Sequence, residues 1–281
     1  MKNKLFKIFI FIIRNFIKFF DIFLKLFNFN FFYLRVVDQL KDEFLEIIIR
    51  NKLVKFYTPS YISAWRVKTL FTKEPETIDW INNFKKINNK IIFWDIGANI
   101  GIYSLYAAAI HPLAKIFAHE PNFKNLSILA KNISINDFQD KIHINQLPLT
   151  EKSIVSDLFY EGNDIEGGAD SSFSKSTNSH INSFKIIGAN IDFLIKNKII
   201  EYPNYIKIDI DGLENLVLKG ARNALNYKYL TSILIEIDIS ENKEFKWIDD
   251  QLNTYGFNLY SKHHCNRNIY NHIYYKKVCE L

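Results

Sequence analysis

One stretch constrains the fold more than any other: residues 93–101, which read FWDIGANIG. A largely apolar run at residues 90–96 leads into two closely spaced glycines, and a mostly apolar segment follows as far as Ile110. Such a run is typical of a strand buried on both faces of a parallel sheet. Glycines allow a tight turn and a close approach of ligand to backbone. The stretch therefore predicts strand, turn and helix, the first unit of an α/β domain.

The same order of elements recurs along the rest of the chain. Further strands are expected at residues 114–120, 141–147, 205–212 and 231–238, with a final pair at 257–260 and 268–277. Helices are expected at residues 122–134, 191–197, 212–225 and 240–256, the last ending at Gly256 as a left-handed cap. This alternation predicts a Rossmann-like three-layer α/β sandwich. The long polar connection at residues 156–184 suits a lid or substrate loop, or a plain solvated loop.

The residues before this domain have a different pattern. Helical spacing of apolar residues predicts a helix over residues 31–58, and residues 60–90 fit helical turns with a helix near Thr77 to Phe84. The expected organisation is therefore an amphipathic basic helix at residues 1–30, a helical N-terminal extension at 31–89, and the α/β domain at 90–281.

The first thirty residues combine charge with many aromatic side chains. Within them the longest uncharged stretch, Ile8–Ile13, is far shorter than the roughly 20 residues of a membrane span. No small-residue cleavage site follows, which argues against a signal peptide. On a helix, the charged residues form one narrow stripe beside a wide apolar arc: Lys7, Arg14, Lys18, Asp21 and Lys25. The helix suits an anionic membrane surface, or packing on the protein body or a second subunit.

Net charge excludes one class of partner. The formal charge is +6, of which residues 1–25 carry +5, so the remainder is nearly neutral. A nucleic-acid binding face needs its positive charge on the folded body. The two cysteines, Cys265 and Cys279, match no metal spacing and suit a reducing, cytoplasmic setting. We therefore expect a cytoplasmic protein, peripheral on the inner membrane face where the N-terminal helix binds membrane instead of a partner.

The glycine turn and a second acid indicate a cofactor. Glu120 ends the second strand, 19 residues after Gly101, where a carboxylate can accept hydrogen bonds from both ribose hydroxyls. The GANIG spacing lacks the middle glycine that a pyrophosphate needs, and no P-loop is present. S-adenosylmethionine has a ribose and no phosphates. The expected cofactor-binding residues are Asp95 for the ammonium group, the turn residues Gly97, Ala98, Asn99 and Gly101, and Glu120, Pro121 and Asn122.

The chain resembles the FkbM family of S-adenosylmethionine-dependent methyltransferases over roughly residues 90–240. The matching motifs are FWDIGANIG, AHEPN, a helix bearing Leu129, Asn132 and Asn136, then IKIDIDGLENLVLKGA, and ILIEI. The resemblance implies a class I methyltransferase fold. Two departures are Asp211, where the family usually has Glu, and His119, where an aromatic residue often precedes the EP pair.

Acids near the ends of two central strands are the expected catalytic residues. Lys207, Asp209 and Asp211 alternate and so point to one side, and Glu236 lies in the corresponding place on the next strand. Asp209 is expected to act as base or substrate orienter with Lys207 holding its charge, although a structural salt bridge fits the same residues. A second interpretation is a divalent cation bound by Asp209, Asp211, Glu214 and Glu236, which would acidify the acceptor hydroxyl, because clustered carboxylates suit hard cations.

Other polar residues are weaker candidates. The small residues of the long connection resemble a family segment and could contact substrate, but a solvated loop fits them as well: Gly167, Gly168, Ser171, Ser172 and Ser174. Asp192 resembles a family LDD-like segment and suits a helix cap better than a catalyst.

These observations together predict an O-methyltransferase. The basic N-terminal helix favours a sugar hydroxyl of a surface glycan or glycolipid, while a polyketide or other small-molecule hydroxyl is the alternative within the family. A membrane-docked scaffold protein that keeps the fold without turnover is the alternative from another class. The acids at positions 95, 120, 209 and 236 speak against that alternative.

Overall fold

The computed structural model describes residues 2–27, 30–41, 43–162, 165–169, 171–173, 182–240 and 242–276. The chain forms two compact units, Met1–Phe44 and Leu45–Leu281. Each unit is described by itself below.

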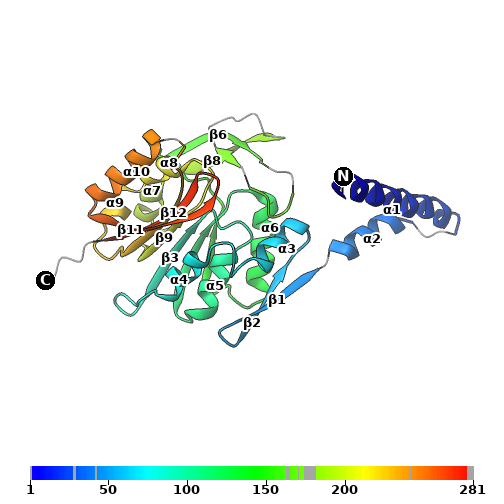
Figure 1. Cartoon of the computed structure of the whole chain (residues 1–281), viewed down its shortest axis with the longest axis horizontal. Helices are drawn as coiled ribbons and strands as arrows, with labels where there is room; N and C mark the ends of the chain where they lie inside the picture. Colours follow the sequence, from blue (N-terminus) through cyan, green and yellow to red (C-terminus); the bar gives the residue numbers. More distant parts are fainter. Residues whose placement is uncertain are drawn as a thin grey trace. The chain divides into compact units, whose positions relative to one another are not determined.

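A seven-stranded sheet forms the centre of the larger unit (Figure 1). Its strands, in spatial order, are β5 (Ile142–Asn145), β4 (Ala114–His119), β3 (Ile91–Ile96), β9 (Tyr205–Ile208), β10 (Ser232–Asp238), β12 (Ile269–Lys276) and β11 (Phe257–Asn266). The pairs from β5 to β10 are parallel, and β12 runs antiparallel to both of its neighbours. The order therefore reverses direction between β3 and β9, the crevice where α/β folds bind ligands.

Helices cover both faces of this sheet. One face carries α3 (Tyr61–Lys68), α4 (Pro75–Asn82), α5 (Ile102–Ile110) and α6 (Phe123–Ser134). The other carries α7 (Ile191–Lys196), α8 (Glu214–Lys219), α9 (Arg222–Asn226) and α10 (Asn242–Thr254). Strand β3 is buried along its whole length, and Phe93 packs in the first core while Trp94 packs in the second. The three-layer Rossmann-like sandwich is confirmed.

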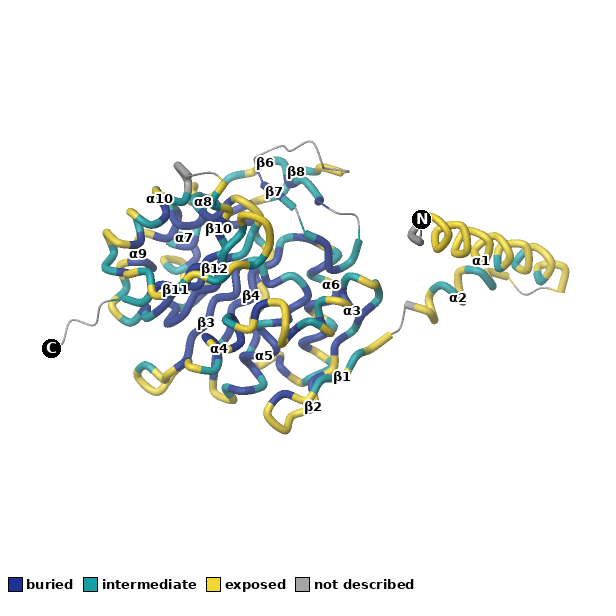
Figure 2. Tube along the Cα trace, viewed as in Figure 1, coloured by how far each residue is buried: buried dark blue, intermediate teal, exposed yellow. Residues whose placement is uncertain are grey.

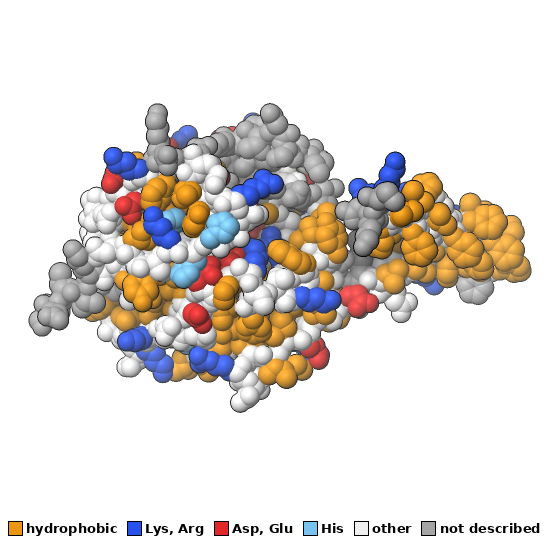
Figure 3. Space-filling view, viewed as in Figure 1, with side chains coloured by type: hydrophobic (Ala, Val, Ile, Leu, Met, Phe, Trp, Pro, Cys, Tyr) orange, Lys and Arg blue, Asp and Glu red, His pale blue; other side chains and the backbone are white. Residues whose placement is uncertain are grey.

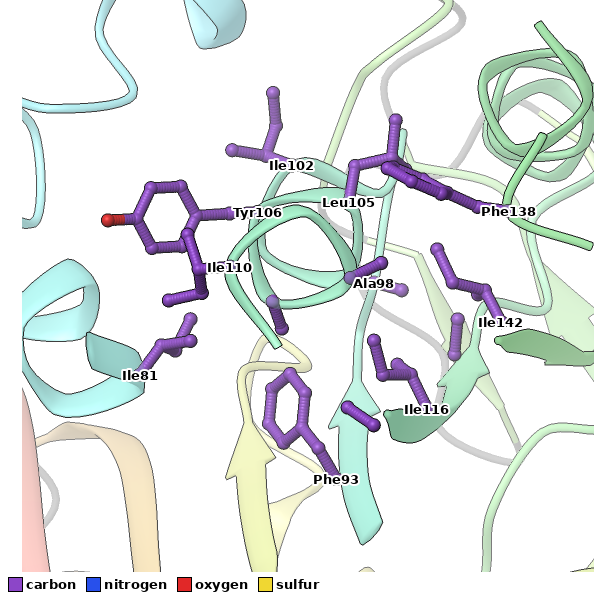
Figure 4. Close-up of a cluster of buried hydrophobic side chains, with 14 of the residues drawn as sticks. Ile81, Phe93, Ala98, Ile102, Leu105, Tyr106, Ile110, Ile116, Phe138 and Ile142 are labelled. Carbon is purple, nitrogen blue, oxygen red and sulfur yellow. The ribbon is translucent and has the colours of Figure 1, made fainter. Parts of the chain in front are cut away.

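The helix after the glycine turn is held by apolar contacts on several sides. Tyr106 and Ile110 project from α5 on the side of Ile81 of α4, and Leu105 projects on the other side, beside Phe138 (Figure 4). All five side chains are buried. This packing fixes the start of α5, and with it the turn that precedes it.

The prediction of one helix over residues 31–58 is wrong beyond residue 41. The chain instead forms a hairpin of β1 (Phe44–Ile49) and β2 (Lys52–Tyr57), turned by Arg50 and Asn51, which both have positive φ. The burial of β1 alternates from residue to residue. Three consecutive isoleucines favour a strand because β-branched side chains fit a pleated surface better than a helix.

Two further elements differ from expectation. The polar connection contributes a second, antiparallel sheet in the order β7 (Ser172–Phe173), β6 (Ile154–Tyr160) and β8 (Ser183–Ala189). The single helix expected at residues 212–225 is divided into α8 and α9 at Gly220. A Cβ at Gly220 would lie 2.3 Å from the carbonyl oxygen of Thr150, so the backbone there passes too close for any side chain.

The smaller unit is a helical hairpin of α1 (Lys2–Lys25) and α2 (Phe32–Lys41). Asp21 accepts a hydrogen bond from the backbone N–H of Tyr33, and Phe20 contacts Phe32. Most of α1 is exposed (Figure 2), and hydrophobic side chains cover much of the face in view (Figure 3). Among the described residues, no helix combines the length and apolar character needed to cross a bilayer.

Candidate functional site

The glycine turn adopts the strained geometry that its sequence predicts. Gly97 and Gly101 have φ values of 85° and 87°, and Asn99 also lies in the left-handed region at 51°. A Cβ at Gly97 would lie 1.8 Å from the carbonyl oxygen of Asp209. Glycine is therefore required there by the neighbouring strand as well as by φ.

The backbone amides of the turn already have acceptors inside the protein. Gly97 and Ala98 both donate to the carbonyl oxygen of His119 at 3.0 Å, and Asn99 donates to Glu120. Ile100 donates to the Asn99 side chain. Gly101 donates to the carbonyl oxygen of Ala98 at 2.8 Å. The turn thus shapes a cavity wall but has no amide left in residues 97–101 for an anion.

Glu120 lies directly after β4 and lines the main cavity. Its two carboxylate oxygens accept hydrogen bonds from the backbone N–H groups of Asn99 and Asn122, each at 2.8 Å. The residue is only 5% exposed, and burial raises the pKa of Glu120 to about 7 even though both amides favour the charged form. The two amides fix the carboxylate while its remaining lone pairs can accept from a diol.

The main cavity has a volume of about 180 Å³ and lies at the carboxyl ends of β3, β4, β9 and β10. Its lining includes four apolar side chains, called the apolar slot below: Pro121, Leu147, and Phe159 and Phe173 of the small sheet. Glu120 lines the same cavity as this apolar slot. Pro121 and Asn122 follow Glu120, and Asn122 caps α6.

Asp209 and Lys207 form an ion pair at the same end of the sheet. Lys207 Nζ lies 2.7 Å from Asp209 Oδ2, and the Lys207 side chain is 1% exposed whereas that of Asp209 is 25% exposed. Burial favours a neutral Asp209, but the ammonium groups of Lys207 and Lys73 outweigh it and lower the pKa of Asp209 to about 2. Asp209 therefore carries a negative charge at the cavity wall.

Glu236, on β10, also lines the cavity and has no hydrogen-bond partner within the described residues. The negative charge of Asp209, together with burial, raises the pKa of Glu236 to about 9. Near pH 7, therefore, Asp209 is charged and Glu236 is neutral, although both line the same cavity.

A third acid, Glu74, was missed by the sequence interpretation. It is 1% exposed, directly precedes α4, and accepts a hydrogen bond from the hydroxyl of Tyr103 at 2.8 Å. Carboxylate oxygens of Glu74, Asp209 and Glu236 lie within 4.8 Å of one another. Burial opposes its charge, yet Lys207 and Lys73 lower the pKa of Glu74. Its signal in the sequence was the helix start at Pro75, which indicates a cap and not a buried acid.

The expected cation ligands do not all come together. Of the four acids considered, Asp209 and Glu236 belong to the three-acid cluster, whereas Asp211 and Glu214 lie outside it. Asp211 is exposed, with φ of 55°, at the rim of the cavity. Glu214 accepts from the backbone N–H of Gly212, and burial raises its pKa to about 7.

Asp95 lies deeper than expected. It is 1% exposed, accepts a hydrogen bond from Ser104 at 2.6 Å, and leaves its second oxygen without a partner within the described residues. Burial raises the pKa of Asp95. The residue is absent from the walls of both cavities that adjoin the glycine turn, and its hydrogen bond to Ser104 joins the end of β3 to α5.

The connection after β6 is tied to the turn. The carbonyl oxygen of Gly168 accepts hydrogen bonds from the side chains of Asn99 and Asn125, at 2.8 and 3.1 Å. Ser171 accepts from Asn122 at 3.0 Å, and both Ser171 and Ser172 line the cavity. Ser174 and Cys279 lie outside the described residues.

Asp192 acts as a cap in the structure. Its carboxylate accepts hydrogen bonds from the backbone N–H groups of Asn223 and Ala224, at the start of α9. It lies on α7, on the opposite face of the sheet from α5 and α6.

The residues at the carboxyl ends of the strands fit a nucleoside that lacks phosphates. The apolar slot and a fixed carboxylate in the same cavity suit a base and a ribose. Because the turn amides are all engaged, the turn lacks the anion cradle of a pyrophosphate site.

Comparison with known proteins agrees with this geometry. The family described as "Methyltransferase FkbM domain" matches residues 95–263, more than half of the chain. The hexuronic acid methyltransferase AglP of Haloferax volcanii is 27% identical over 185 residues, which cover 65% of this chain and 70% of that protein. Methyltransferase sdnD of Sordaria araneosa is 28% identical over 101 residues, covering 36% of this chain and 39% of that protein.

Solved structures with lower identity were also found. Precorrin-6y C5,15-methyltransferase from Geobacter metallireducens has a TM-score of 0.45 at 15% identity, covering 75% of this chain and 92% of that one. TrmK of M. capricolum, solved with S-adenosyl-homocysteine, has a TM-score of 0.43 at 16% identity, covering 72% and 67%. The match over residues 95–263 identifies the family: the chain belongs to the FkbM methyltransferases, which are S-adenosylmethionine-dependent enzymes with a class I fold.

Proposed function

We propose that this enzyme methylates a hydroxyl oxygen of a sugar in a surface glycan or glycolipid. The observation that carries the proposal is the placement of Asp209 and Glu236 on the wall of the cavity that also contains Glu120. Two acids beside a nucleoside-shaped cavity suit an acceptor that must lose a proton. The relative AglP is named for hexuronic acid, a sugar derivative, which supports a sugar acceptor over a polyketide.

In this proposal each residue has a defined role. Glu120 binds the ribose, and the apolar slot binds the adenine. S-adenosylmethionine, when bound, supplies the methyl group. Lys207 keeps Asp209 charged so that Asp209 can orient the acceptor hydroxyl, and Glu236 accepts the hydroxyl proton in its ionised form. No divalent cation is needed for these roles. If a cation took part, its ligands would be the three clustered acids Glu74, Asp209 and Glu236, and not the set expected from the sequence.

The acceptor can be identified by mass spectrometry of surface glycans from a strain that lacks the gene. We expect glycans lighter by one methylene unit, and restoration when the gene is returned. The purified enzyme should then methylate the undermethylated glycan, with and without a chelator. Unchanged glycans, combined with turnover of a polyketide hydroxyl, would reassign the acceptor.

Glu236 gives a test of the chemistry. If a hydroxyl is the acceptor, the rate of methyl transfer should rise with pH towards about 9, where Glu236 becomes ionised. Glu236→Gln should lower kcat by about 10²-fold or more and remove this rise, because glutamine resembles only the protonated acid. A flat profile for both proteins would indicate an acceptor without a proton to lose, such as a carboxylate.

The scaffold alternative predicts a different result in solution. A relic fold would bind neither S-adenosylmethionine nor its product, whereas the enzyme should bind both, and Glu120→Ala should weaken both. Isothermal titration calorimetry on the full chain measures this binding and so distinguishes the enzyme from the scaffold protein.

We further propose that the helical hairpin of the smaller unit docks on an anionic membrane at the cytoplasmic face. On α1 the residues that are half-buried in the hairpin are Ile17, Asp21 and Leu24. The exposed apolar side chains elsewhere on the helix are accessible by 41% or more, and these by 59% or more: Leu5, Phe6, Phe9, Phe11, Phe16, Phe19 and Ile22. Four basic residues flank this surface, which suits anionic headgroups above an apolar layer: Lys7, Arg14, Lys18 and Lys25.

Vesicle flotation tests this docking. The full chain should float with vesicles containing phosphatidylserine, and less with pure phosphatidylcholine. Deletion of residues 1–30 should abolish flotation. Equal recovery with both vesicle types, or concentration-dependent dimers without flotation, would favour packing against a second copy.

A further inference from the structure

A second, smaller cavity of about 40 Å³ adjoins the glycine turn. It shares five residues with the main cavity: Arg66, Lys73, Gly97, Asn99 and Asp209. The two cavities therefore meet along a common wall, on the side of the turn that faces α3 and the start of α4. A ligand in the main cavity can extend one end towards this wall.

The common wall contains two cations that the family match does not include. Arg66 lies on α3 and Lys73 lies just before α4, both outside residues 95–263. Arg66 donates its Nε to the carbonyl oxygen of Gly167 at 2.7 Å and makes no other hydrogen bond within the described residues. Its terminal guanidinium nitrogens therefore remain able to donate to a ligand.

Lys73 is held in place by an acid behind it. It pairs with Glu74, whose other oxygen accepts from the hydroxyl of Tyr103. The Lys73 side chain is 38% exposed while Glu74 is buried, so part of the lysine remains open to the cavity. An ammonium group has three donors, and Glu74 uses one.

S-adenosylmethionine and its product both end in an α-amino acid, which has a carboxylate. That carboxylate needs hydrogen-bond donors, and the amides of residues 97–101 are already engaged within the protein. Arg66 and Lys73 are the basic residues on the wall where the two cavities meet. Lys207 lines only the smaller cavity and is committed to Asp209.

We propose that Arg66 and Lys73 bind the α-carboxylate of S-adenosylmethionine, and that Glu74 positions Lys73 for this contact. The proposal rests on the cofactor of the proposed function and adds residues from the N-terminal extension to the cofactor site. It also gives a physical reason why this extension accompanies the catalytic domain. A planar guanidinium beside an ammonium suits a carboxylate with two oxygens.

Calorimetry with two thioethers tests the proposal without turnover. S-adenosylhomocysteine has the amino-acid end, and 5′-methylthioadenosine has the same adenosine without it. The wild-type protein should bind S-adenosylhomocysteine at least about tenfold more tightly. Because only that ligand contacts the two cations, its affinity should also fall with added salt more steeply.

Single variants locate the contact. In Lys73→Met and in Arg66→Gln, the Kd for S-adenosylhomocysteine should rise about tenfold to a hundredfold, while that for 5′-methylthioadenosine changes less than about twofold. Lys68→Met is the matched control, because Lys68 is exposed on α3 and is absent from both cavity walls. It should bind both ligands as the wild type does.

Three results would overturn the proposal. Equal losses for both ligands would show a general distortion of the site, and unchanged binding of S-adenosylhomocysteine would show that the cations contact something else. A wild-type protein with no preference between the ligands and no salt effect would contradict it without any variant. If the wild type binds neither ligand, the proposed function fails together with this inference.

Discussion

Glu120 is the residue that we propose binds the ribose of the cofactor. Its carboxylate is fixed by two backbone amides, and burial raises its pKa to about 7 from an ordinary value near 4.5. Ribose hydroxyls donate to the ionised form more strongly than to the neutral acid. A bound nucleoside should therefore favour the charged carboxylate.

We expect the affinity for S-adenosylhomocysteine to rise several-fold between pH 6 and pH 8, as Glu120 ionises. Glu120→Ala should bind at least about tenfold more weakly at pH 8, with much less dependence on pH. Calorimetry at both pH values measures this. The expectation is contradicted if the variant retains the full pH dependence of the wild type.

Gly97 shows how closely β3 and β9 approach. The position combines a φ of 85° with a carbonyl oxygen 1.8 Å from where a Cβ would be. Gly256 has nearly the same φ, 83°, but nothing lies within 4 Å of a Cβ placed there. The two glycines therefore separate the cost of backbone conformation from the cost of a clash.

Gly256→Ala should lower the free energy of unfolding by about 1 kcal/mol, the cost of a left-handed alanine. Gly97→Ala should lower it by about 3 kcal/mol or more, because β3 and β9 must also separate. Urea unfolding of both variants measures the difference. Similar losses at both positions would mean that the strand contact is looser than the geometry indicates.

At the scale of elements, α6 serves as the edge partner of the β1–β2 hairpin. Asn132 accepts a hydrogen bond from the backbone N–H of Tyr57 at 2.7 Å and donates to the carbonyl oxygen of Ile100. One turn later, Asn136 bonds both backbone groups of Lys55. On this side of β2, two asparagines at spacing i, i+4 therefore make the backbone hydrogen bonds that a neighbouring strand would make.

Asn132→Ala should destabilise the fold by about 2–4 kcal/mol, since it leaves the Tyr57 N–H and the Ile100 carbonyl group without this partner in a buried place. Asn136→Ala should cost about 1 kcal/mol or less, because water can replace its side chain at the exposed Lys55. Thermal or urea unfolding distinguishes them. Equal losses would contradict the role assigned to burial.

This pairing also explains where sequence interpretation succeeded and failed. The central strands and their helices were predictable because each apolar run is buried on both faces, as in β3. The hairpin was not, because Ile47 and Ile48 fit a helical period locally and the partner of β2 lies some 75 residues later, at Asn132. The same applies to Glu74, whose burial depends on Tyr103 and Lys207 and is not visible in its own segment.

Within the site, the sequence predicted the positions of some side chains but not of others. The sequence correctly placed Asp209 beside Lys207, since alternation on a strand fixes which side each residue points to. It could not show that Asp95 is enclosed or that Arg66 and Lys73 reach the turn, because both depend on how α3 and α4 pack. Side-chain roles that arise from a single element were predictable, and those that arise between elements were not.

For the larger unit as a whole, two buried histidines contribute to the pH dependence of stability. His272 on β12 is fully buried, stacks on Phe245, and has no partner for either ring nitrogen within the described residues. Burial lowers its pKa to about 4, and burial likewise lowers the pKa of His119 to about 3. Both rings are therefore neutral in the fold at pH values where an unfolded chain, with histidine pKa near 6.5, takes up protons.

The sign of the resulting pH dependence follows from proton uptake. Below about pH 6.5 the unfolded chain binds protons at these histidines that the folded chain does not, so their contribution to stability falls as pH falls towards 4. Glu120, Glu214 and Glu236, whose pKa values are raised, contribute in the opposite direction over the same range. For His272 alone the loss of stability should approach about 3 kcal/mol.

The variant His272→Phe keeps an aromatic ring against Phe245 and removes the titration of the histidine. The free energy of unfolding of this variant minus that of the wild type, both measured in urea, should increase as pH falls from 7 to 4.5. An unchanged difference would contradict the role of His272 and would direct attention to His119, because its Nε2 is also buried without a partner in the described part of the chain.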